Sequence, residues 1–230
     1  MIRQTPSLPG IFITGTSTGV GKTYIGVLLA KALTEKQFSV VPRKPVESGC
    51  DFAQGELLPS DAQALMQAAA YGGTLADVCP YRFQPPISPA RAARLANTQL
   101  TTEQLVDACL DNSKGHFLLV EGAGGFYSPI TGDGLNADLA VALQLPVLLV
   151  AENTLGVLNQ VLLNVEAIST RGLELAGIVL NKLNDDPDGQ MDNATDLRER
   201  LDCGVYLQEF NRSQLSDALI DAIATRTLYQ

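Results

Sequence analysis

Residues 15–23 read Gly-Thr-Ser-Thr-Gly-Val-Gly-Lys-Thr, a composition typical of a phosphate-binding loop. The apolar run 11–13 precedes them and a helical pattern follows, so a strand leads into the turn and a helix begins where it ends. Backbone N–H groups of such a turn bind an anion, Lys22 reaches the β- and γ-phosphates, and the Thr23 hydroxyl suits Mg²⁺. A ligand-free glycine turn is the alternative, which the lysine and hydroxyl at their usual places disfavour. The first glycine lies one residue earlier than usual, which makes the loop longer by one.

Three further charged residues have types suited to phosphoryl chemistry. Lys44 follows the second apolar run, where a second ammonium neutralises charge on a transferring phosphoryl group; a solvated surface lysine is the alternative. Glu121 ends an apolar run and enters a glycine-rich stretch, where a carboxylate needs a cation or hydrogen-bond donors; we expect Mg²⁺, and an acidic cap on the loop is the alternative. Asp61 follows Ser60 at the start of a helical pattern. From spacing alone, we expect Ser60 to be the N-cap and Asp61 to interact with the helix dipole.

Other polar positions allow two interpretations. Ser48 and Gly49 continue the turn after Lys44 and present a hydroxyl and an approachable backbone to a ligand. The proline-rich segment 80–89 is stiff and forms either a substrate-facing loop or a surface connection. Residues 154–157 open a long helical pattern whose N–H groups suit a small carboxylate, although an ordinary helix start fits equally well.

Length and composition favour one domain over residues 1–230, because 230 residues with 46% hydrophobic content bury a sizeable core. A formal net charge of −9 argues against binding to nucleic acid or an anionic membrane. Residues 1–10 have no apolar core of a signal peptide, and no apolar stretch is long enough to span a bilayer. We expect a cytoplasmic protein.

Histidine and cysteine usage excludes several kinds of site. His116 is the only histidine, so histidine metal clusters are ruled out, and its place before an apolar run indicates an ordinary edge position. The four cysteines are widely spaced without a C-x-x-C pair, which favours buried, reduced thiols over disulfides or zinc.

The pattern of elements predicts an α/β fold of the phosphate-loop NTPase type, a mostly parallel sheet with helices on both faces. Short apolar runs typical of buried strands cover 11–14, 38–41, 117–120, 146–151 and 176–180. Helical patterns cover 23–36, 60–71, 101–112, 135–143 and 155–171, with another apolar stripe over 215–223. We expect 72–89 and 122–134 to be long functional loops. The phosphate loop, Lys44, Glu121 and Asn181 all follow strands, so they should meet at one edge of the sheet.

The motifs together resemble the dethiobiotin synthetases over roughly residues 9–183. The matching segments are the loop at 15–23, Lys-Pro-Val-x-Ser-Gly at 44–49, Ser-Asp-Ala at 60–62, Ser-Pro at 88–89 and Val-Glu-Gly-Ala-Gly-Gly at 120–125. Thr16 fits the longer loop of that family. The resemblance implies an ATP- and Mg²⁺-dependent conversion of 7,8-diaminopelargonic acid and CO₂ into dethiobiotin, ADP and phosphate, through a carbamate and a carbamic-phosphoric anhydride.

The same resemblance implies a role for each matching residue. Lys44, Lys22 and Thr18 would be catalytic. Thr23, Asp61 and Glu121 would bind Mg²⁺, which replaces the capping interpretation of Asp61 on family grounds. The nucleotide would contact Gly19, Val20, Gly21, Lys22, Thr23, Asp61, Glu121, Gly122, Ala123, Gly124 and Asn181. The diamine would contact Ser48, Ser88, Pro89 and, from the neighbouring subunit of a homodimer, Leu155, Gly156 and Asn159.

Two departures and two alternative classes bear on this assignment. Ser17 stands where the family often has aspartate, and the segment 203–207 lacks the proline of the family's Gly-x-Ile-Pro pattern. A cobyrinic acid diamide synthetase would carry an additional amidotransferase domain, for which the chain has no room. A chromosome-partitioning or cell-division ATPase would have a second lysine near the loop's start, where this chain has Thr16 and Ser17, and a basic or amphipathic surface.

Overall fold

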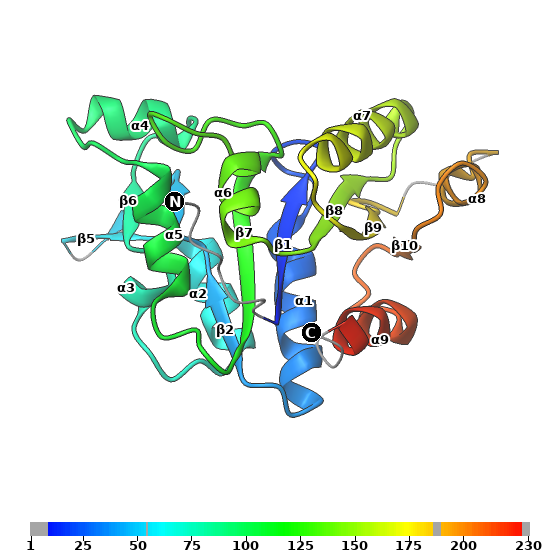
Figure 1. Cartoon of the computed structure of the whole chain (residues 1–230), viewed down its shortest axis with the longest axis horizontal. Coiled ribbons are helices and arrows are strands. Elements are labelled where there is room, and N and C mark those ends of the chain that lie inside the picture. The colour runs from blue at the N-terminus through cyan, green and yellow to red at the C-terminus, as the bar shows by residue number, and fades with distance from the viewer. Residues whose placement is uncertain (1–8, 54, 186–189, 227–230) are drawn as a thin grey trace.

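The computed structural model describes residues 9–53, 55–185 and 190–226 and is built around a parallel sheet (Figure 1). Its strands are β1 (Gly10–Gly15), β2 (Val40–Arg43), β7 (Phe117–Gly125), β8 (Val147–Glu152), β9 (Leu175–Asn181) and β10 (Val205–Gln208). Their order in the sheet is β10-β9-β8-β1-β7-β2. Because β1 lies between β7 and β8, the phosphate loop that follows β1 leaves from the middle of the sheet.

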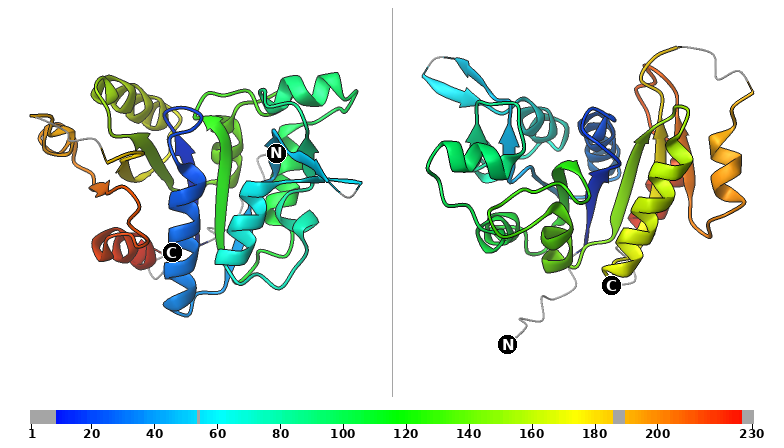
Figure 2. Two further views of the ribbon diagram at one scale, coloured as in Figure 1. Left: turned by 180° about the vertical axis from the view of Figure 1, so that it is seen from behind. Right: turned by 90° about the horizontal axis from the view of Figure 1, so that it is seen from above.

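Helices cover both faces of this sheet (Figure 2), as the sequence predicts. Side chains alternate along β1, so Ile11 and Ile13 enter one hydrophobic core and Phe12 enters the other. The first core is closed by α1 (Lys22–Glu35), α2 (Ser60–Ala68) and α9 (Asp217–Arg226). The second is closed by α5 (Thr102–Leu110), α6 (Asn136–Leu143), α7 (Val157–Thr170) and α8 (Asn193–Arg198).

Short elements fill the segment between β2 and α5. Strand β3 (Val46–Ser48) pairs in parallel with β6 (Tyr81–Phe83), and β4 (Asp51–Ala53) forms an antiparallel hairpin with β5 (Glu56–Leu58). Helices α3 (Leu75–Val78) and α4 (Pro89–Leu95) flank β6. The expectation of a continuous loop over 72–89 is therefore wrong, because elements of three or four residues are too short to show a periodic pattern.

Strand boundaries differ from the predictions by one residue at β1, β8 and β9 and by more at β2 and β7. The run predicted at 38–41 forms β2 two residues later, and β7 continues through the glycines to Gly125, which still pairs with Gly15 of β1. The predicted loop 122–134 therefore begins as a strand. Strand β10 was not predicted. The predicted N-terminal segment 1–10 lies outside the described residues over 1–8. The predicted domain range 1–230 also contains residues 54, 186–189 and 227–230, which lie outside the described residues as well.

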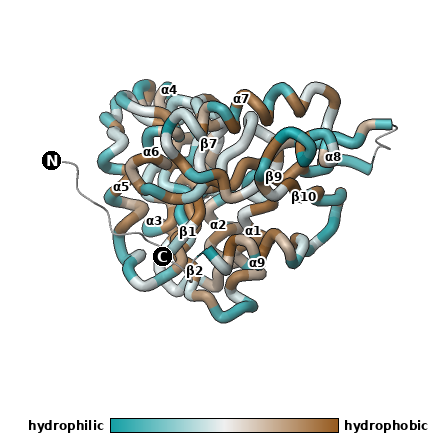
Figure 3. The backbone as a smooth tube through the Cα atoms, turned by 45° about the vertical axis from the view of Figure 1, so that its right-hand side comes forward, coloured by the Kyte–Doolittle hydropathy of each residue, from teal (hydrophilic) through white to brown (hydrophobic). Residues whose placement is uncertain are grey.

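The remaining sequence expectations concern burial and membrane spans. Hydrophobic segments gather along the sheet and its covering helices, and hydrophilic segments lie at the periphery (Figure 3). Within the described ranges, no helix has both the length and the apolar character needed to cross a membrane. All four cysteines are free; Cys50, Cys79 and Cys109 are buried as expected, but Cys203 is only partly buried. His116 precedes β7, with Nδ1 2.8 Å from the Ser39 hydroxyl.

Candidate functional site

A cavity of about 400 Å³ lies at the carboxyl ends of β1, β2 and β7. Polar groups reach it from the phosphate loop, the segment 44–48, α2 and the end of β7, and also from Ser88 and Ser128. The lining residues are Thr18, Gly19, Gly21, Lys22, Thr23, Lys44, Glu47, Ser48, Asp61, Ser88, Pro89, Glu121, Ala123, Gly124, Ser128 and Pro129.

The phosphate loop is held in a conformation that depends on glycine. Gly21, the residue before α1, has φ +91°, and a Cβ there would lie 2.2 Å from Asn181 Nδ2. No side chain caps the N-terminus of α1, and the first backbone bond of the helix runs from the Ile25 N–H to the Gly21 carbonyl at 3.0 Å, so the N–H groups that precede Ile25 are available to a ligand. Lys22 Nζ donates a hydrogen bond to the Ser17 carbonyl at 3.0 Å, which folds the lysine over the loop. This arrangement suits an anion.

Asn181 supports the loop from the end of β9. Its Nδ2 donates to the Val20 carbonyl at 3.0 Å, which ties the loop to the sheet. Its Oδ1 is buried and has no partner in the part of the chain that the structure describes. A buried acceptor without a donor is costly, so this oxygen is suited to receive an N–H from a ligand.

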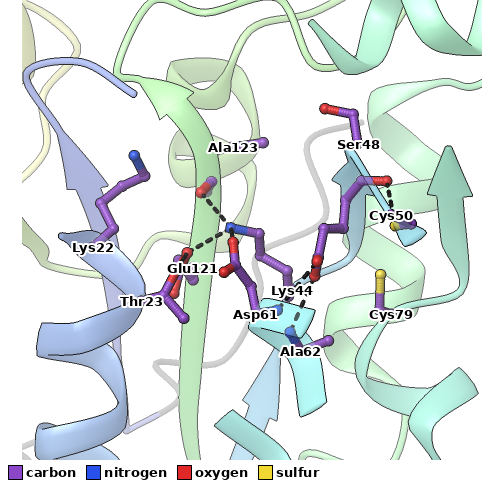
Figure 4. Close-up of polar contacts among 12 residues, drawn as sticks. Lys22, Thr23, Lys44, Ser48, Cys50, Asp61, Ala62, Cys79, Glu121 and Ala123 are labelled. Atoms are coloured by element: carbon purple, nitrogen blue, oxygen red, sulfur yellow. Dashed lines mark hydrogen bonds and ion pairs between the residues drawn. The ribbon is translucent and has the colours of Figure 1, made fainter. Parts of the chain in front are cut away.

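Lys44 joins the two carboxylates of the site (Figure 4). Its Nζ lies 2.5 Å from Glu121 Oε1 and 3.0 Å from Asp61 Oδ2, and it also donates to the Gly122 carbonyl at 3.5 Å. Thr23 Oγ1 donates to the same Glu121 oxygen at 2.8 Å. Lys44 is 4% exposed and Glu121 1% exposed, so the contact between them is shielded from water, whereas the Asp61 side chain is 38% exposed.

Burial and neighbouring charges act in opposite directions on the pKa values of this cluster. Burial lowers the pKa of Lys44, but the carboxylates of Glu121 and Asp61 outweigh it and raise that pKa, so Lys44 stays a cation. Burial, followed by the charge of Lys44, lowers the pKa of Lys22 to about 8. Burial raises the pKa of Asp61, yet the Lys44 charge and hydrogen bond bring it below its ordinary value.

The donor set of this cluster fits Mg²⁺. Glu121 Oε2 is buried and has no partner among the described residues, and the Thr23 hydroxyl and Asp61 lie beside it. The described ranges contain no group of three His, Cys, Asp or Glu residues arranged to hold a metal. Mg²⁺ needs no such cage, because it is usually held by one or two carboxylates with phosphate and water oxygens completing its shell.

The structure corrects the capping interpretation of Ser60 and Asp61. The N-cap of α2 is Pro59, no side chain of its own caps the helix, and Ser60 is the first helical residue. Asp61 does lie in the first turn, but its carboxylate turns toward Lys44 (Figure 4). The spacing identified the helix start correctly and could not show where the carboxylate points.

Sequence reasoning missed two polar residues of the cavity. Glu47 is 4% exposed and accepts the backbone N–H groups of Asp61 and Ala62, each at 3.1 Å. Burial, followed by the nearby Asp61 charge, raises its pKa. Ser128 Oγ accepts the Gly125 N–H at 2.9 Å. The only sequence signal for Glu47 was its place between Lys44 and Ser48.

The predicted substrate residues fall into two groups. Ser48, Ser88 and Pro89 line the cavity, and the Ser48 hydroxyl donates to the Ile87 carbonyl at 2.6 Å. Leu155, Gly156 and Asn159 lie outside it, exposed at the start of α7, and Leu155 is 91% exposed. Val20, Gly122 and Asn181 do not line the cavity either. The Gly122 carbonyl accepts a hydrogen bond from Lys44, and Asn181 donates one to the Val20 carbonyl in the phosphate loop.

Comparisons with known proteins identify a matching family model and similar relatives. A family model described as "AAA domain" matches residues 9–211. The ATP-dependent dethiobiotin synthetase of Anaeromyxobacter dehalogenans is 44% identical over 181 residues, which is 77% of this chain and 79% of that protein. The corresponding protein of Ruthia magnifica is 35% identical over 209 residues, 91% of this chain and 94% of that one.

Solved structures share the architecture with low sequence identity. The cell division protein FtsY of Thermotoga maritima has a TM-score of 0.54 and 17% identity, with 95% of this chain and 69% of that chain covered. The chloroplast FtsY of Physcomitrella patens has a TM-score of 0.52 and 18% identity, with 97% and 67% covered. At such identity the likeness concerns the fold alone.

Proposed function

This chain belongs to the dethiobiotin synthetase family, and we propose that it joins 7,8-diaminopelargonic acid and CO₂ at the expense of ATP to form dethiobiotin for biotin biosynthesis. The observation that carries this proposal is Lys44. It is a buried ammonium held between Asp61 and Glu121, beside a phosphate loop and inside one cavity. We take residues 1–230 as one synthetase domain.

The reaction needs charge stabilisation more than covalent work by the protein. An amine of the diamine adds CO₂ and loses a proton to give a carbamate, whose oxygen attacks the γ-phosphate and releases ADP. The second amine then attacks the carbonyl carbon of the anhydride, loses a proton and expels phosphate, which closes the ureido ring. Lys22 and Lys44 supply positive charge where the phosphoryl oxygens gather negative charge, and Thr18 lies at the cavity's edge with them.

The nucleotide residues follow from the loop and its support. Gly19, Val20, Gly21, Lys22 and Thr23 would hold the phosphates, and Gly122, Ala123 and Gly124 would bound them from the end of β7. Asn181 Oδ1, which has no partner among the described residues, would accept an N–H of the adenine amino group. Thr23, Asp61 and Glu121 would hold Mg²⁺, which when bound neutralises charge on the phosphates.

The diamine would occupy the side of the cavity formed by Ser48, Ser88 and Pro89. A homodimer would bring Leu155, Gly156 and Asn159 of one subunit toward the cavity of the other. Leu155 is 91% exposed, so its side chain is available to contact a neighbouring subunit. Sedimentation of the purified protein tests the dimer, and a monomer at assay concentration would contradict it.

One assay tests the function. Diaminopelargonate, bicarbonate, Mg²⁺ and ATP are supplied together, and dethiobiotin is sought by mass spectrometry alongside ADP. We expect one ADP for each dethiobiotin, and isotopic label from bicarbonate in the ureido carbon. ATP turnover that proceeds equally without the diamine would refute the proposal.

A further inference from the structure

Helix α2 brings Asp61 to the site but does not cap itself. Its N-cap is Pro59, which has no side-chain acceptor, and neither Ser60 nor Asp61 caps it with a side chain. The first backbone bond within the helix runs from Gln63 N–H to the Pro59 carbonyl at 3.0 Å. The N–H groups before Gln63 therefore need acceptors from elsewhere in the molecule.

Glu47 supplies two of those acceptors from a different element. Its Oε1 accepts the Asp61 N–H and its Oε2 accepts the Ala62 N–H, both at 3.1 Å. Both carboxylate oxygens are thus used on consecutive N–H groups of one nine-residue helix. A negative charge at this end also complements the helix dipole.

The position of Glu47 in the chain links the two sides of the site. It lies in β3, three residues after Lys44 and next to Ser48, both of which line the cavity. By holding Asp61 through its backbone, Glu47 fixes α2 against the segment that carries Lys44. The Asp61 carboxylate then lies 3.0 Å from Lys44 Nζ, and Figure 4 shows Asp61, Ala62 and Lys44 together.

A charged cap at this position carries two costs that a neutral cap would avoid. A carboxylate next to Asp61 adds repulsion between like charges, and burial adds a desolvation cost. A serine or threonine at the N-cap would stabilise the helix without either cost, as Thr101 does for α5, where its hydroxyl accepts the Gln104 N–H. The arrangement found here gives, in addition, a fixed distance between α2 and the turn after β2.

We propose that Glu47 is a positioning residue that holds Asp61 in place for the divalent cation and for Lys44. This inference rests on the proposed function for the cation's role in the reaction, and it concerns binding that takes place without the diamine. It assigns Glu47 no contact with a reacting atom.

The test compares Glu47→Gln with Thr101→Ala. Gln keeps the shape of Glu47 but retains a single acceptor oxygen, and Thr101→Ala removes the cap of another nine-residue helix that does not line the cavity. Binding of Mn²⁺ is followed by electron paramagnetic resonance with ATP present and no diamine. We expect Glu47→Gln to weaken Mn²⁺ binding about tenfold, which is typical of substitutions at residues that orient a metal ligand. Thr101→Ala should leave Mn²⁺ binding within about twofold of that of the unsubstituted chain. Thermal melting reports the stability of both variants.

Hydrogen exchange and a third variant provide two further readouts of the role of Glu47. Hydrogen exchange of the Asp61 and Ala62 amides should become faster in Glu47→Gln, and Glu47→Asp, which keeps both oxygens, should bind Mn²⁺ more tightly than Glu47→Gln. Unchanged Mn²⁺ binding in Glu47→Gln, or an equal loss in Thr101→Ala, would overturn the inference. A chain that binds Mn²⁺ as expected but makes no dethiobiotin would refute the proposed function and support the role of Glu47.

Discussion

Arg43 and Lys44 are consecutive buried cations whose surroundings differ in the groups that compensate their charge. Arg43 has no exposed surface, and it donates to the carbonyls of Ala108 at 3.1 Å, Pro42 at 2.9 Å and Asp111 at 2.6 Å. Its guanidinium also lies 5.5 Å from the centre of the Tyr71 ring. Lys44 instead contacts carboxylates on two other elements. Backbone carbonyls therefore compensate the charge of Arg43, and side-chain carboxylates compensate the charge of Lys44.

This difference supports a structural role for Arg43 and the catalytic role that we propose for Lys44. The carbonyls of Ala108 and Asp111 belong to the C-terminal end of α5, where the helix dipole favours a positive charge. The planar guanidinium, with its five donors, matches such fixed acceptors. The carboxylates around Lys44 face a cavity and fit a second cation as well, so the ammonium beside them can interact with a ligand.

Arg43→Met should give the largest effect on stability. It leaves buried carbonyls at the end of α5 without donors, and we expect the free energy of unfolding to fall by about 3 kcal/mol. Urea unfolding followed by circular dichroism measures the change. Arg94→Met, at an exposed position of α4, is the control and should change stability by less than about 0.5 kcal/mol. A loss below about 1 kcal/mol for Arg43→Met would show that Tyr71 and packing, rather than the donors, hold this region.

Lys44→Gln should affect turnover. Gln keeps a donor for Glu121 but no charge, and we expect the turnover number to fall at least about a hundredfold with ATP affinity largely retained. Steady-state kinetics and a separate ATP titration distinguish the two quantities. Turnover near that of the unsubstituted chain would show that Lys44, like Arg43, is a structural cation.

The sequence predicted those parts of the site that adjoining residues determine. The phosphate loop, Lys44 and Glu121 could be identified because each follows a recognisable apolar run that forms a strand of the central sheet. The strand order could not be predicted, but parallel pairing alone was enough to bring their ends to one edge.

The parts that the sequence did not predict depend on contacts between distant residues. The role of Arg43 is set by the end of α5, 65 residues away at Ala108, and that of Glu47 by α2, 14 residues away at Asp61. No periodicity records such contacts. Strands β3 and β6 are three residues long, which is too short for a pattern, although they position Ser48 beside the cavity.

Asn136 resembles Arg43 in bonding to backbone groups and resembles Lys44 in lying next to the cavity. It is fully buried, its Nδ2 donates to the carbonyls of Ala123 at 2.6 Å and Gly125 at 2.8 Å, and its Oδ1 accepts the Ala123 N–H at 3.1 Å. It satisfies only backbone, as Arg43 does, but Ala123 lines the cavity.

Asn136→Ala should therefore lower both stability and ATP affinity. We expect a loss of about 2 kcal/mol in the free energy of unfolding, because buried backbone groups lose their partners. The dissociation constant for ATP should rise several-fold in the same variant, measured by isothermal titration calorimetry with Mg²⁺ present. Loss of stability with an unchanged ATP constant would class Asn136 with Arg43 alone.

The smallest effect is expected for a cation whose charge water already compensates. Lys36 Nζ lies 3.0 Å from Asp221 Oδ1 and links the end of α1 to α9, but the two side chains are 44% and 62% exposed. Lys36→Ala should lower the free energy of unfolding by less than about 1 kcal/mol, and the coupling energy from a double-mutant cycle with Asp221→Ala should be of the same small size. Because salt screens exposed pairs, the coupling should shrink further as ionic strength rises. A coupling comparable to the effect of Arg43→Met would mean that burial is not what makes Arg43 important, and that docking of α9 on α1 depends on this pair.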